Sequence, residues 1–118
     1  MASHNETGKE SEDKAVSWLT ENGFTVLHRN WRHLYYELDI VATREKYLCF
    51  IEVKSRTGDY FGFPETAVTK RKFRNLRRAA DQYLYLNPGY SWIQFHVLAI
   101  TLYKDKPAEY FLLEDVCL

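Results

Sequence analysis

One seven-residue run limits what this chain can fold into more than any other feature. The run from Leu48 to Lys54 is apolar on both alternating faces of an extended strand, apart from Glu52 and Lys54. Such a run is typical of a central strand that is covered on both sides, rather than of a surface strand. An unpaired carboxylate or ammonium buried there would be strongly destabilising, so these charged groups must have partners.

The residues around this strand predict the element order αβββ, α, ββ. The first segment repeats apolar residues at helical spacing and reaches a good C-terminal stop at Asn22-Gly23. The expected elements are a helix over 8–22, strands over 24–31, 36–42 and 47–56, a helix over 69–86, and strands over 92–103 and 109–113. We therefore expect one α/β sandwich-like domain over residues 1–118.

Composition narrows the class of protein without naming a partner. The chain has 118 residues, of which 46% are hydrophobic, and this suits a globular domain. Sixteen basic and 16 acidic residues give a net charge of zero, so any basic surface must be local. No stretch is apolar enough to span a membrane, and the polar, acidic N-terminus is unlike a signal or transit peptide. We expect a cytoplasmic protein with no membrane partner.

Four charged side chains interrupt the second and third strands: Glu37, Asp39, Glu52 and Lys54. The register of the hairpin decides how they meet. A turn centred between residues 44 and 45 places Asp39 opposite Phe50 and diagonal to Glu52, with their Cα atoms about 7 Å apart. A turn shifted by one residue pairs Asp39 directly with Glu52. Either register gathers the four on one face, whereas a three-residue turn would separate them unless a bulge intervened.

Three carboxylates and one lysine on one face would form a hard, oxygen-rich site. Oxygen ligands without histidine or cysteine favour Mg²⁺ or Mn²⁺, and a backbone carbonyl near Val53 could complete the set. Lys54 lies about 6.6 Å beyond Glu52, beside the metal, and nearby carboxylates should raise its pKa. We assign it to orienting the attacking water and stabilising negative charge. The alternative is a buried salt-bridge network that serves only the fold, although one lysine cannot neutralise three carboxylates.

A fourth carboxylate, Glu12, occupies an unusual position on the first helix. It lies three, four and seven residues before the apolar residues of that helix, and so on the buried stripe. A ligand role would explain this placement. The alternative is a residue at the edge of the stripe, with its carboxylate reaching out to water.

The order of these residues resembles a known family. Asp39 followed by Glu52-Val53-Lys54 is similar to the PD-(D/E)XK motif of restriction-endonuclease-like nucleases. The longer pattern, from about Gly8 to Val116, resembles the YraN family of uncharacterised bacterial proteins. The matching residues are Gly8, Glu12, Ala15, Asn30, the segments 37–42 and 50–56, Ala67-Val68-Thr69, Lys72 and Ala79-Ala80.

This resemblance implies a restriction-endonuclease-like, three-layer αβββαβ core, in which helices flank a mixed central sheet. It implies a catalytic set of Asp39, Glu52 and Lys54, with a divalent metal held by Asp39 and Glu52. A likeness to Holliday-junction resolvases adds Glu12 to the metal ligands. Glu37 is expected to support the site.

Two positions depart from the family pattern. Tyr36 stands where a glycine is usual, and we expect it to narrow the approach to the site. Gln94-Phe95-His96 replaces the usual Arg-Phe-Asp, and we expect His96 to be hydrogen-bonded within the fold rather than to bind metal.

A local basic stretch opens the second helix. Its members are Lys70, Arg71, Lys72, Arg74, Arg77 and Arg78. Cations at a helix N-terminus oppose the helix dipole, and phosphate binding would explain that cost; a merely solvated face is the alternative. All of these except Lys72, together with Arg56, are the expected nucleic-acid-binding residues. Lys72 is expected to point inward and to support the site. The aromatic side chains expected near the site are Tyr35, Tyr60, Phe61 and Phe63, which could stack on bases or pack in the core.

These features predict a Mg²⁺- or Mn²⁺-dependent endonuclease-like protein that hydrolyses phosphodiester bonds in structured or single-stranded nucleic acid, DNA rather than RNA. No recognition helix or base-reading motif is apparent, which favours selection by structure. One alternative is a catalytically silent nucleic-acid-binding module that keeps the nuclease fold. Another is a protein-interaction domain whose acidic cluster is only structural. A homodimer would suit a symmetric substrate.

Overall fold

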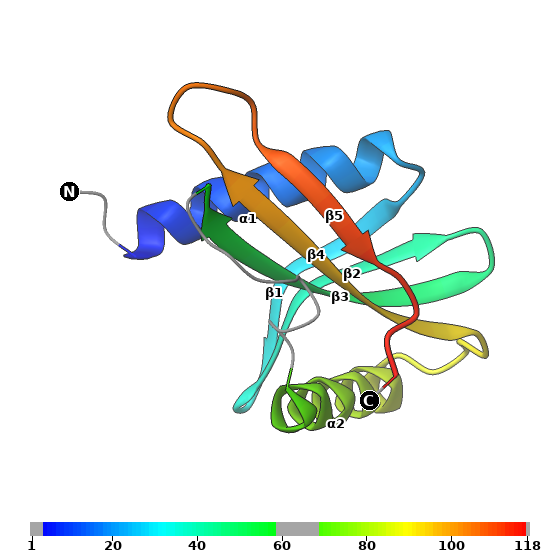
Figure 1. Cartoon of the computed structure of the whole chain (residues 1–118). Coiled ribbons are helices and arrows are strands. Elements are labelled where there is room, and N and C mark those ends of the chain that lie inside the picture. Colours follow the sequence, from blue (N-terminus) through cyan, green and yellow to red (C-terminus); the bar gives the residue numbers. More distant parts are fainter. Residues whose placement is uncertain (1–3, 59–68, 118) are drawn as a thin grey trace.

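The apolar run from Leu48 to Lys54 lies in the middle of the sheet. A computed structural model describes residues 4–58 and 69–117, with side chains from residue 9 onward. β3 (Tyr47–Thr57) is third in a five-stranded sheet of order β1-β2-β3-β4-β5. It pairs antiparallel with β2 (Tyr36–Arg44) and parallel with β4 (Ile93–Leu102), so the sheet is mixed. β1 (Thr25–His33) and β5 (Glu109–Leu113) form its edges (Figure 1).

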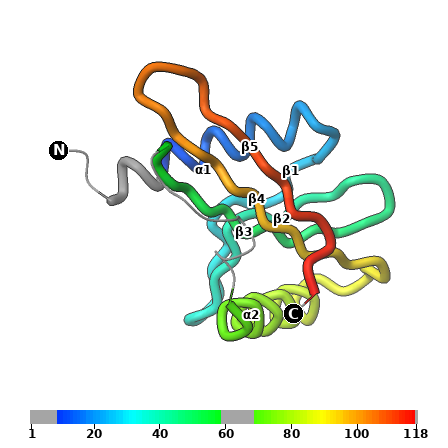
Figure 2. The backbone as a smooth tube through the Cα atoms, viewed as in Figure 1, coloured from blue at the N-terminus to red at the C-terminus, as the bar shows by residue number. Residues whose placement is uncertain are grey.

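One helix covers each face of this sheet, as Figures 1 and 2 show. α1 (His4–Glu21) packs through Ala15 and Leu19. α2 (Lys70–Leu86) supplies the crossover between the parallel strands β3 and β4, and it packs on the opposite face. The predicted three-layer α/β arrangement with a mixed central sheet is therefore observed.

β3 explains why both helices are needed. Leu48 and Phe50 point into the cluster under α2, whereas Cys49 and Ile51 point into the cluster under α1, and all four are at most 1% exposed. Both faces of this strand are thus removed from water. Beneath α2, the ring of Tyr83 contacts the rings of His28, Trp31 and Phe50 edge-on.

The ends of the elements differ from the predictions in physically meaningful places. α1 begins at His4 rather than at residue 8, and so runs through Gly8, a residue that costs a helix interior about 1 kcal/mol. β2 continues to Arg44, which shortens the predicted turn to Glu45-Lys46. The other strand ends lie within two residues of their predicted positions. Among the helices of the described chain, none is long and apolar enough to cross a membrane.

Candidate metal centre

The β2–β3 hairpin sets the relative position of the central carboxylates. Its ladder runs from Arg44 opposite Tyr47 to Ile40 opposite Ile51. One further step in this register would place Asp39 opposite Glu52, which is the second of the two registers considered from sequence. The backbone ladder ends before that step, and the Val53 N–H instead donates to Asp39 Oδ2 at 2.8 Å. A side-chain carboxylate thus takes the place of a backbone acceptor where the two strands stop pairing.

The other neighbour of β2 is distorted at the same level. Arg29 pairs with Ile40 and Trp31 with Leu38, so Asn30 lies opposite Asp39. Asn30 has a φ of 49°, which asparagine tolerates better than most residues. Leu38 packs in the cluster under α2 and Ile40 in the cluster under α1, so strict alternation fails between them. Regular pleating is therefore interrupted at Asp39, although Glu37 and Asp39 still line the same cleft.

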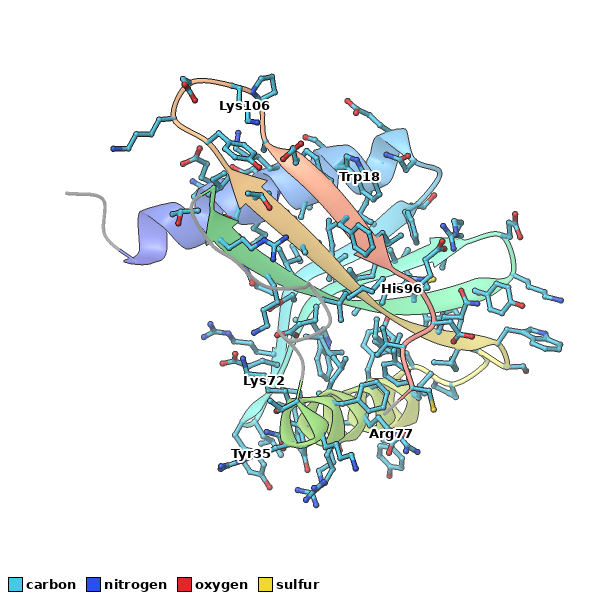
Figure 3. The ribbon with its side chains drawn as sticks, in the orientation of Figure 1. Trp18, Tyr35, Lys72, Arg77, His96 and Lys106 are labelled. Carbon is cyan, nitrogen blue, oxygen red and sulfur yellow. The ribbon has the colours of Figure 1, made fainter. Side chains whose placement is uncertain are left out.

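Asp39 and Glu52 line a cleft of about 570 Å³ between the β1–β2 hairpin and the first half of α2. The hairpin contributes Tyr35, Tyr36 and Glu37, and α2 contributes Lys72, Asn75, Leu76 and Arg78. Figure 3 shows Tyr35 and Lys72 on the same side of the molecule, beside the start of α2. Charged groups of both signs thus share one concave surface, as is typical of binding sites.

The electrostatics of Asp39 are unusual for a carboxylate. Burial and then the negative charge of Glu52 raise the pKa of Asp39 to about 6, against the lowering effect of the Val53 N–H and of Lys54. A second carboxylate in a poorly solvated place makes the ionised form costly. A cation between the two would remove that cost, and carboxylate oxygens suit Mg²⁺ or Mn²⁺.

Two lysines flank the carboxylates. Lys54 Nζ lies 3.4 Å from Glu52 Oε1. Burial works against the charge of Lys54, but a hydrogen bond with Lys72 and the attraction of Glu52 outweigh it and raise the pKa of Lys54, as predicted. The same hydrogen bond and the charge of Lys54 lower the pKa of Lys72. Lys72 lines the same cleft as Asp39 and Glu52, although it remains exposed to solvent.

Glu12 lies near the site, but its oxygens are engaged. Its charge contributes to the raised pKa of Asp39, and its side chain is only 18% exposed. Arg29 Nε donates to Glu12 Oε1 at 2.8 Å, and the amide of Asn30 donates to Oε2. Over residues 9–58 and 69–117, no three His, Cys, Asp or Glu side chains are gathered closely enough to hold a metal. Arg29, which also binds Asp13, received no role from the sequence.

The other predicted residues divide between the cleft and its surroundings. Glu37 lines the cleft, yet its side chain is 66% exposed and lies 3.7 Å from Arg32 Nε. Arg78 also lines it, although helical spacing had placed this residue opposite the apolar face. Arg56 lies in a different, smaller cleft and donates to Thr101 Oγ1 at 3.1 Å. Lys70, Arg71, Arg74 and Arg77 are exposed on α2 outside the cleft. Tyr60, Phe61 and Phe63 lie outside the described residues.

The two residues that depart from the family pattern, Tyr36 and His96, lie in different parts of the molecule. Tyr36 lines the cleft beside Asp39, where a glycine would leave it wider. His96 is buried in β4, and its Nδ1 accepts the Asp115 N–H at 2.9 Å. Burial lowers the pKa of His96, which favours its neutral form. The expected hydrogen bond within the fold is thus found at Nδ1, whereas the buried Nε2 has no hydrogen-bond partner among the described residues.

Comparison with known proteins places the chain in a family. A model of the uncharacterised protein family UPF0102 matches residues 11–100. A UPF0102 protein of Bacteroides thetaiotaomicron is 49% identical over 86 residues, which are 73% of this chain and 71% of the relative. One from Parabacteroides distasonis is 44% identical over 117 residues, or 98% and 93% of the two chains. One from Bifidobacterium longum is 40% identical over 104 residues, or 85% and 84%. The chain therefore belongs to the UPF0102 (YraN-like) family.

Proposed function

We propose that the cleft is the active site of a divalent-metal-dependent nuclease with a restriction-endonuclease-like fold. The observation that carries the proposal is the setting of Asp39, a half-buried carboxylate that accepts the Val53 N–H and lines one cleft with Glu52. In this setting its pKa is raised to about 6. A carboxylate pair held in this way is costly for the fold alone. Strained or uncompensated groups of this kind are concentrated at functional sites.

The donor set fits a hard divalent cation. Asp39 and Glu52 would hold it, and Glu12 would join them if its carboxylate exchanged Arg29 or Asn30 for the metal. A bound Mg²⁺ or Mn²⁺ supplies a Lewis acid and lowers the pKa of water. The chain itself fixes where this happens, because Val53 holds one oxygen of Asp39 at the end of the β2–β3 ladder.

The basic side chains at the site favour a negatively charged ligand. Lys54, with its raised pKa, stays protonated and is placed to orient a water and to stabilise negative charge developing on a phosphate. Lys72 and Arg78 line the cleft and attract the phosphodiester backbone into it. The exposed cations further along α2, Arg74 and Arg77 among them, extend this positive surface toward flanking phosphates. DNA is the proposed partner.

A cleavage assay tests the proposal. The protein is incubated with single-stranded, duplex and branched DNA and RNA in Mg²⁺ or Mn²⁺, beside Asp39→Asn and Lys54→Ala. We expect metal-dependent cleavage that is lost in Asp39→Asn and reduced about 10²- to 10³-fold in Lys54→Ala. Asp81→Asn, which removes an exposed carboxylate of α2 outside the cleft, is the matched control and should cleave normally.

One observation favours a second function, a nucleic-acid-binding module without turnover. Both oxygens of Glu12 are bound by Arg29 and Asn30, which would leave the metal with fewer carboxylate ligands. Tight DNA binding by the wild-type protein, with no cleavage in either metal, would favour this function. Absence of both binding and cleavage would exclude nucleic acid as the partner.

A further inference from the structure

The tip of the β1–β2 hairpin breaks the usual rules for a tight turn. Leu34 and Tyr35 form its two-residue turn between the paired His33 and Tyr36. Leu34 has a φ of 56°, a conformation that favours glycine or asparagine in such turns. Leu34 is 78% exposed and Tyr35 is 83% exposed. A strained turn that presents two large side chains to water gains little for the fold, which points to a role in contact with a ligand.

This tip borders the proposed metal centre. Tyr35 and Tyr36 line the same cleft as Asp39 and Glu52, and their ring centroids are 4.8 Å apart. The facing wall is polar and basic, with Lys72, Asn75 and Arg78 from α2. The cleft therefore combines an exposed aromatic side chain of the turn, cations of α2 and carboxylates of β2 and β3. Figure 3 labels Tyr35 and Lys72 among these residues.

We propose that Tyr35 is a stacking platform for an unpaired base, so that the site takes single-stranded or frayed nucleic acid rather than an intact duplex. This inference rests on the proposed nuclease function. In an intact duplex both faces of each internal base are covered by its neighbours, so an external ring can stack only on an unpaired or terminal base. The basic wall contacts the backbone of the same strand.

The spacing fits one strand that reaches from the tip to the metal centre. Tyr35 precedes Asp39 by four residues, which corresponds to about 13 Å along a strand. At about 3.4 Å per nucleotide in a stacked strand, this distance corresponds to at most about four nucleotides, and an extended single strand would span it with fewer. Tyr35 is thus a specificity-determining residue, and it does not touch the reacting atoms.

Binding without metal isolates this step from cleavage. Fluorescence anisotropy in EDTA compares a labelled single strand, a blunt duplex, and a duplex with a single-stranded overhang. We expect the wild-type protein to bind the first and third more tightly than the second. Tyr35→Ala should weaken these two about 5- to 100-fold and the blunt duplex much less, because the duplex offers the ring only its two end pairs. Tyr35→Phe, which keeps the ring, should bind as the wild type does. Tyr85→Ala, at a residue 80% exposed on α2 outside the cleft, is the matched control.

A second readout reports stacking directly. An oligonucleotide carrying 2-aminopurine at its unpaired positions should lose fluorescence on binding to wild type and to Tyr35→Phe, and keep it with Tyr35→Ala. Equal affinity of Tyr35→Ala and wild type for every probe would overturn the platform. If Asp39-dependent cleavage persisted in that case, the proposed nuclease function would stand without it. A wild-type protein that neither bound nor cut any probe would overturn both.

Discussion

β2 lies between two turns of equal length whose side chains differ in chemistry. Each turn has two residues, Leu34-Tyr35 before the strand and Glu45-Lys46 after it, and the first residue of each has a φ of 56°. In the second turn, Lys46 is solvated and lies 4.3 Å from the centroid of the Trp92 ring. In the first turn, the side chains are apolar or aromatic and largely exposed. Because the backbone demand is the same, the turn geometry does not impose the aromatic tip.

The contrast continues along the strand itself. From Ile40 to Arg44, every residue of β2 is paired with β3, and Phe50 of β3 is fully buried beneath α2. At Asp39 the ladder stops, and the Asp39 carboxylate, whose pKa is raised, accepts the Val53 N–H in place of a backbone carbonyl. One end of the strand is thus built for stability, whereas the other tolerates a charge that costs stability. Such a difference within one strand is expected where function competes with folding.

The largest expected effect is on the free energy of unfolding, and it compares one substitution at each end of the β2–β3 ladder. Phe50→Ala, at the closed end, should lower the free energy of unfolding by about 3–5 kcal/mol through lost burial and an open cavity. Asp39→Asn, at the open end, should raise it by about 3 kcal/mol near pH 8 without metal. Urea denaturation followed by circular dichroism measures both.

The sign of the Asp39 effect follows from proton linkage. Its folded pKa of about 6 exceeds the ordinary 3.8, so the folded protein holds the proton more tightly than the unfolded chain. The carboxylate therefore destabilises the fold as pH rises from about 4 through 6, and at pH 8 its full cost is present. Asparagine carries no charge and can still accept the Val53 N–H. A less stable Asp39→Asn protein would mean that Asp39 is a structural salt-bridge partner.

The positions of the strands could be predicted from the sequence, because the apolar pattern of β3 and the turn residues around it are local signals. It left the hairpin register open for a physical reason. The turn between β2 and β3 lacks an Asn-Gly pair, and its register depends on a positive φ at Glu45, a residue that does not signal one. The pairing of Asp39 and Glu52 therefore remained one of two possibilities.

Other parts of the site depend on contacts between distant residues. Arg29 holds Glu12 across 17 residues, and that contact follows a register shift in β1 and the unusual φ of Asn30. Arg78 lines the cleft beside the β1–β2 hairpin, a neighbour that a helical wheel cannot include. The residues of the centre could thus be predicted from the sequence, but the partners that each of them contacts could not.

The next effect concerns metal binding at the open end. Because a ligand carboxylate must be ionised, the affinity for Mn²⁺ should fall about tenfold per pH unit below 6 and level off above it. Calorimetric titration across this range measures the dependence. Glu45→Gln, at the exposed carboxylate of the opposite turn, should leave the curve unchanged, whereas Asp39→Asn should remove binding. An affinity that stayed constant between pH 5 and 7 would exclude Asp39 as a ligand.

The smallest effect tests the two turns directly. Leu34→Gly and Glu45→Gly each replace a side chain that is strained at a φ of 56°, and each should raise the free energy of unfolding by about 0.5–1 kcal/mol. Similar gains, measured by thermal denaturation, would show that neither side chain is needed for its turn. If Leu34→Gly were instead destabilising while Glu45→Gly was not, Leu34 would pack in the folded protein. The apolar tip would then be a requirement of folding, and the contrast between the turns would no longer point to a ligand.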